Sequence, residues 1–118
     1  MKYYETIHTE EIQGFNIVFS ITHEDSHPKD CFDYEEEEIR ELCDKIDRGV
    51  YSWFIARVEA HKNGVLLGTD YLGGCLYENP MHFVTQSSDY YSDMVENVIN
   101  EAKNTLELLF LTHKEVTA

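Results

Sequence analysis

The stretch HEDSHPKDC contains three potential metal ligands at every fourth position, His23, His27 and Cys31. On a helix this spacing would gather two imidazoles and a thiolate on one side, and zinc sites are built from such nitrogen and sulfur ligands. Pro28 interrupts a regular helix here, and no fourth ligand is apparent. We therefore interpret the three residues as loop residues near the end of a strand.

The same loop contains carboxylates that could hold a divalent cation through hard oxygen ligands. They do not follow the D-x-D-x-D-G pattern of a calcium-binding EF-hand loop. A cation site here is therefore a minor alternative, and we expect no metal or cofactor. The residues concerned are Glu24, Asp25, Asp30 and Asp33.

No stretch of the chain has the residues of a recognisable catalytic site. A thiolate at Cys31 would need electropositive surroundings, but it lies in the most acidic segment of the chain. The serine pair at 87–88 lacks the G-x-S-x-G nucleophile pattern and suits helix capping. The glycine pair at 73–74 lacks the lysine and hydroxyl residue of a phosphate loop. We expect a protein that is not an enzyme, with a small metal-dependent enzyme as the weaker alternative.

The charge of the chain is its most unusual property. It has 23 acidic residues against 9 lysines and arginines, a net charge of −14. Half of this charge lies between residues 24 and 48, where eleven acids face four bases. Such a surface disfavours direct binding of nucleic acid or of an anionic membrane, because both require neutralisation of phosphates. We expect a partner with a basic surface.

The candidate partner-binding surface is an acidic band centred on the stretch DYEEEEIRELCDK. Tyrosines interleaved with carboxylates would help such a surface to bind arginine-rich partners. A solvated helix face is the alternative, because Glu36 with Arg40 and Glu41 with Lys45 are favourable intrahelical pairs. The band consists of Asp30, Asp33, Glu35, Glu36, Glu37, Glu38, Glu41, Asp44 and Asp47.

In size and charge the chain resembles the small acidic inhibitors of phages and mobile elements, among them anti-restriction and anti-CRISPR proteins. The resemblance implies that carboxylates one helical turn apart imitate phosphates. The acidic band would then occupy the basic groove of a nucleic-acid-binding complex, such as a restriction or CRISPR nuclease, and exclude nucleic acid. The alternative is a non-catalytic accessory or scaffolding domain whose charge serves solubility.

The acidic band requires a helix, which we predict from Tyr34 to Arg48. Asp33 is the expected N-cap, and Gly49 stands where a left-handed C-cap is favoured. The apolar stripe of this helix is narrow and consists of Ile39, Leu42, Cys43 and Ile46. Reduced cysteines are expected, with Cys43 buried on the helix.

Strands are predicted on both sides of this helix. Apolar residues alternate from Phe15 to Thr22, Gly14 marks a turn, and residues 3–9 could form a polar edge strand. After the helix, Asn63-Gly64 is a strong hairpin signal, and the glycine pair at 73–74 indicates a bulge. The register of this turn pairs Lys62 with Val65, Ala60 with Leu67, Val58 with Thr69, Ala56 with Tyr71, Arg57 with Asp70, Ile55 with Leu72 and Trp53 with Gly74.

A loop is expected from Asn79 to Ser88, followed by a long helix from Asp89 to Thr112. Apolar residues nearly encircle the end of that helix, which suggests a homodimer through it. The order β-β-α-β-β-α predicts one α+β domain over residues 1–118, a two-layer sandwich with two helices on one face of a mainly antiparallel sheet. No apolar run long enough to span a membrane and no secretory signal is recognisable, so we expect a cytoplasmic protein.

Overall fold

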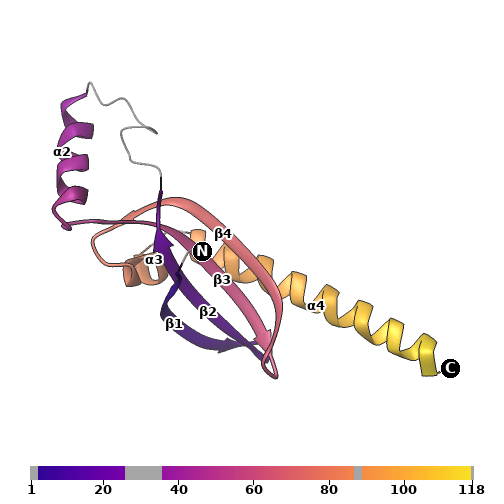
Figure 1. The fold of residues 1–118 in the computed structure, drawn as a ribbon. Coiled ribbons are helices and arrows are strands. Elements are labelled where there is room, and N and C mark those ends of the chain that lie inside the picture. Colours follow the sequence, from indigo (N-terminus) through magenta and orange to yellow (C-terminus); the bar gives the residue numbers. More distant parts are fainter. Residues whose placement is uncertain (1–2, 26–35, 87–88, 118) are drawn as a thin grey trace.

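The chain forms an antiparallel sheet with helices, which confirms the α+β class. The structure is a computed structural model; it describes residues 3–25, 36–86 and 89–117, with side chains up to residue 110. The strands are β1 (Glu5–Ile12), β2 (Phe15–His23), β3 (Ser52–Lys62) and β4 (Val65–Tyr77), in the spatial order β1-β2-β3-β4. The helices are α2 (Glu37–Asp47), α3 (Met81–Gln86) and α4 (Tyr90–Thr117) (Figure 1).

Both hairpins turn through two residues with positive φ. These are Gln13 and Gly14 between β1 and β2, and Asn63 and Gly64 between β3 and β4. Such turns match the right-handed twist of the strands that they join. The two predicted turns are therefore confirmed, although β1 begins and ends later than predicted.

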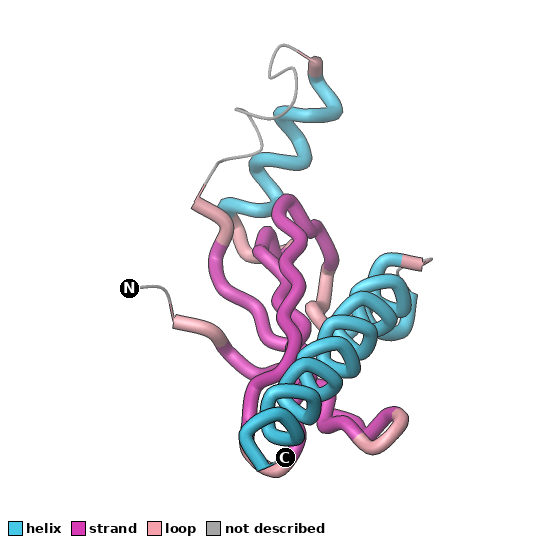
Figure 2. Tube along the Cα trace, turned by 90° about the vertical axis from the view of Figure 1, so that its right-hand side faces the viewer, coloured by secondary structure: helices cyan, strands magenta, loops and turns pink. Residues whose placement is uncertain are grey.

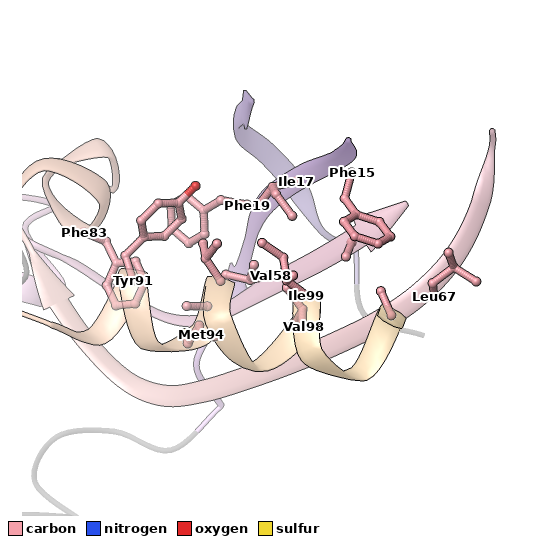
Figure 3. Packing of buried hydrophobic residues seen from close by; sticks show 14 of the residues in the cluster. Phe15, Ile17, Phe19, Val58, Leu67, Phe83, Tyr91, Met94, Val98 and Ile99 are labelled. Atoms are coloured by element: carbon pink, nitrogen blue, oxygen red, sulfur yellow. The ribbon is translucent and has the colours of Figure 1, made fainter. Parts of the chain in front are cut away.

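One face of the sheet carries the hydrophobic core. Phe15, Ile17 and Phe19 of β2 are buried at alternate positions, as predicted. Val98 of α4 packs in the same core, and the ring of Phe83 from α3 stacks on Phe19 with 5.2 Å between centroids (Figure 3). The predicted loop before α4 thus contains a short helix, which places Phe83 in the core and begins where the Met81 N–H donates a hydrogen bond to the Asn79 side chain at 2.9 Å.

The register of the second hairpin differs from the predicted one beyond its first pairs. Lys62 pairs with Val65 as predicted, but the register shifts next to Ala60, which pairs with Gly68 and not with Leu67. Leu67 is thus an extra residue on β4, and it is buried in the core. A shift of one residue moves each following side chain to the opposite face of a strand.

This shift overturns the predicted pairing of Arg57 with Asp70. Arg57 pairs with Tyr71 on the face away from α4, whereas Asp70 lies on the α4 side, where Asn97 donates a hydrogen bond to it at 3.1 Å. The remaining predicted pairs are also wrong: Val58 pairs with Asp70, Ala56 with Leu72 and Trp53 with Leu76.

The predicted bulge at residues 73–74 is confirmed by a second register shift. Gly74 has a φ of +66°, and its N–H donates a hydrogen bond to the Glu24 carboxylate at 2.8 Å. The Trp53 ring lies 3.4 Å from the place that a Cβ on Gly74 would take, so it covers this glycine although the two residues are not paired.

The helices differ in their relation to the sheet. The helix that covers its core face is α4, and α3 adds Phe83 to the same core beside the start of α4, whereas α2 lies beyond one end of the strands (Figures 1 and 2). The prediction that the helix over residues 34–48 covers this face together with the long helix is therefore wrong. The apolar stripe of α2 is too narrow to cover a sheet: Cys43 is buried, while Ile39, Leu42 and Ile46 are half-buried.

Candidate functional site

The acidic side chains on α2 all face solvent. The described members of the acidic band are exposed: Glu36, Glu37, Glu38, Glu41, Asp44 and Asp47. The other members, Asp30, Asp33 and Glu35, lie outside the described residues. The helix therefore presents its charge on a projecting element (Figure 2).

The two ends of α2 differ in how they are capped. Its N-cap is Glu36, in extended conformation and without a side-chain capping bond, so the helix begins later than predicted. Carboxylates in the first turn favour the positive end of the helix dipole. At the other end Gly49 has a φ of +79° and donates to the Ile46 carbonyl at 3.0 Å, while Val50 donates to Lys45 at 2.8 Å. These two backbone hydrogen bonds close the end of the helix and confirm the predicted glycine C-cap.

The two predicted intrahelical ion pairs are absent from the described part of α2. Arg48 instead pairs with Asp44 at 2.9 Å, and both side chains are exposed. The Lys45 ammonium lies over the ring of Tyr51, 5.8 Å from its centroid, and not beside Glu41. The basic side chains of α2 therefore form fewer ion pairs with the acidic band than the sequence predicted.

The candidate metal ligands are not brought together in the part of the loop that is described. His23 ends β2 and is exposed, whereas His27 and Cys31 lie outside the described residues. The Glu24 carboxylate accepts the hydrogen bond from Gly74, and Asp25 is exposed. Over residues 3–25, 36–86 and 89–117, no three His, Cys, Asp or Glu side chains group as metal ligands would.

The two described cysteines are buried free thiols. Cys43 lies on α2, as predicted, and Cys75 lies on β4 and donates a hydrogen bond to the Leu72 carbonyl at 3.3 Å. Burial raises the pKa of the Cys75 thiol to about 11. A thiol held in the neutral form in this way is a poor nucleophile near neutral pH.

A cavity of about 390 Å³ lies where the end of the sheet meets α2. Ile46 of α2 contributes to its lining, together with Tyr3 and Glu5 at the start of the chain and Tyr51 and Trp53 around the start of β3. Sequence reasoning missed this cavity, because its lining comes from segments far apart in the chain. The available signal was the excess of aromatic residues over predicted core positions.

The face of the sheet away from α4 carries a stacked arginine. The guanidinium carbon of Arg57 lies 3.9 Å from the centroid of the Tyr4 ring. The same guanidinium lies 3.5 Å from the carboxylate of Glu59, the next residue on that face. Tyrosine and carboxylate together therefore already hold an arginine side chain within this chain.

None of the helices in the described ranges is both long and apolar enough to cross a membrane. No protein-family model matches the chain, and no curated protein and no solved structure is significantly similar to it.

Proposed function

We propose that this chain is a small acidic domain that binds a basic protein surface through α2. The observation that carries the proposal is the exposure of all five acids of that helix and of its N-cap Glu36, at a position beyond the end of the sheet. A projecting helix can enter a groove that the flat face of a sheet cannot. Its charge would steer a basic partner toward it and favour fast association.

The finer form of the proposal is imitation of nucleic acid. Carboxylates at successive turns of a helix stand about 5.4 Å apart along its axis, so they form a row of negative charges on one side. Glu37, Glu41 and Asp44 make such a row. In this form α2 occupies the groove of a nucleic-acid-binding complex, such as a restriction or CRISPR nuclease, and excludes its substrate.

The alternative is an accessory or scaffolding domain whose charge keeps it soluble. A high net charge of either sign prevents aggregation, wherever on the surface the charged groups lie. The two functions therefore differ in one respect. Solubility depends on the total charge, whereas partner binding depends on where the charge lies.

The experiment compares two triple variants with equal net charge. One variant, Glu37→Gln/Glu38→Gln/Glu41→Gln, removes charge from α2. The control, Asp93→Asn/Glu96→Gln/Glu107→Gln, removes exposed charge from α4. Each is used to capture proteins from a lysate that contains restriction and CRISPR nucleases, at low and high salt, with identification by mass spectrometry.

We expect wild type and the α4 control to retain a basic partner that the α2 variant loses, and high salt to weaken this capture. Duplex DNA added to the purified pair should then displace the chain. An α2 variant that keeps every interaction contradicts the proposed function. A partner that binds through α2 but ignores DNA contradicts only the imitation of nucleic acid.

A further inference from the structure

The cavity between α2 and the end of the sheet combines aromatic rings with a carboxylate. Trp53 and Phe54 are 6% and 2% exposed and supply apolar lining, whereas Tyr3 is 83% exposed and lies at the rim. Glu5 and Tyr51 also line the cavity. Its volume of about 390 Å³ falls in the range of small-ligand sites, which are mostly apolar with a few polar groups placed among them.

The charge of the lining favours a cation. Among the described residues that line the cavity, Glu5 is the one acid, His23 is the one side chain that can carry a positive charge, and there is no lysine or arginine. Ile46, through which α2 contributes to the lining, stands in sequence between Lys45 and Asp47, whose charges offset each other, so the charge of the lining rests on Glu5. An anionic ligand would be repelled by Glu5, whereas a cation would be attracted by this carboxylate and by the aromatic rings.

Two cationic side chains of this protein already lie over tyrosine rings. The Lys45 ammonium lies 5.8 Å from the centroid of Tyr51, a ring that lines the cavity. On the far face of the sheet, Arg57 stacks on Tyr4 at 3.9 Å with Glu59 beside it. The second arrangement repeats the chemistry of the cavity, a tyrosine ring next to a carboxylate, with an arginine in place.

We infer that this cavity binds an arginine side chain of a partner protein, with Tyr3 and Tyr51 against the guanidinium and Glu5 as its counter-ion. Arginine suits the lining better than lysine, because its planar group stacks on aromatic rings, pairs with a carboxylate through two hydrogen bonds and is more weakly hydrated. The inference rests on the proposed function and adds to it: the acidic helix attracts the partner, and the cavity selects an arginine on it.

The test uses a probe with one arginine, the acetylated and amidated tripeptide Gly-Arg-Gly, so that it cannot bridge the cavity and the acids of α2. Two further tripeptides replace arginine by citrulline, which is neutral, and by lysine. Trp53 is the one tryptophan of the chain, so a single indole N–H resonance reports on the cavity during an NMR titration. We expect saturable binding of the arginine peptide on the order of a millimolar dissociation constant.

Three variants locate the binding. Glu5→Gln and Tyr51→Leu should each weaken it at least about threefold. Lys45→Gln should strengthen it, because this substitution removes a cation that already lies over Tyr51. The matched control is Arg40→Gln, which removes the same charge from an exposed position of α2 that does not line the cavity. A gain of affinity in Lys45→Gln alone cannot result from misfolding.

Three results overturn the inference: equal binding of the citrulline peptide, an arginine titration that leaves the Trp53 resonance unchanged, or equal affinities in wild type and Glu5→Gln. Equal binding of the lysine peptide overturns the choice of arginine. The triple variant of α2 should keep its affinity for the arginine peptide within about twofold, because this short probe does not reach that surface. If the cavity does not bind arginine, the proposed function of α2 is not contradicted. If α2 binds no partner, arginine binding in the cavity is not contradicted.

Discussion

The hydroxyl of Tyr91 donates a hydrogen bond to the carboxylate of Glu10 at 2.9 Å, which joins the first turn of α4 to the edge strand β1. Tyr91 is buried, and the ring nitrogen Nε2 of His8 lies 2.7 Å from the same carboxylate oxygen. The edge strand is thus held to the helix that covers the core by a polar contact at its outer side.

Loss of this hydroxyl should destabilise the fold. Tyr91→Phe leaves a half-buried carboxylate without one of its donors, which costs about 1–2 kcal/mol in the free energy of unfolding. The control is Tyr90→Phe, because that neighbouring ring is 57% exposed and its substitution should have no effect beyond error. Urea unfolding followed by circular dichroism measures both. Equal stability of the two variants would mean that the contact contributes nothing.

Alkaline pH should destabilise the protein through two buried groups. Burial is the main cause that raises the pKa of both, the Cys75 thiol from 9.0 to about 11 and the Tyr91 phenol well above its ordinary value of 10.0. Both groups hold their protons more tightly in the folded state, so their contribution to stability is complete below pH 9 and decreases as the pH rises. The free energy of unfolding should fall between pH 9 and 11, and less steeply in Cys75→Ala. A profile of unchanged slope in that variant would contradict the assignment to Cys75.

Gly68 should tolerate no side chain. A Cβ at this position would lie 2.4 Å from the carbonyl oxygen of Val98, so α4 would have to move away from β4. We expect Gly68→Ala to reduce the free energy of unfolding by about 2–3 kcal/mol. The exposed neighbour Leu66→Ala provides the control in the same thermal and urea unfolding experiments. A Gly68→Ala variant of wild-type stability would contradict this prediction.

The homodimer through the C-terminal helix stays a prediction, and the structure shows which apolar side chains would form it. Leu108, Leu109 and Phe110 are 65%, 57% and 65% exposed, on a part of α4 that extends past the sheet (Figure 1). Light scattering should give twice the mass of one chain, and Leu108→Gln/Phe110→Gln should return it to the monomer. Glu107→Gln is the control. A monomeric wild type at high concentration would refute the prediction.

Many of the strands and turns could be predicted from the spacing of apolar residues and from turn residues within short stretches of the chain. The alternation from Phe15 to Phe19 and the Asn63-Gly64 turn predicted strands that the structure contains, because side-chain period and turn geometry depend on neighbours in the chain. The C-cap at Gly49 belongs to the same class. Exposure of the acids on α2 also followed from their charge, since carboxylates are rarely buried without partners.

Long-range packing decided the rest. The register shift that pairs Gly68 with Ala60 places a glycine where α4 touches β4, and no local signal shows that contact. The core face is covered by α4, with Phe83 of α3 in the same core, and α2 lies beyond one end of the strands, which no local signal indicated. The cavity lined by Glu5, Ile46 and Tyr51 exists only where these segments meet, because each contributes one part of it. Local sequence therefore determined the elements and their charge, and tertiary packing determined which side chains share a surface.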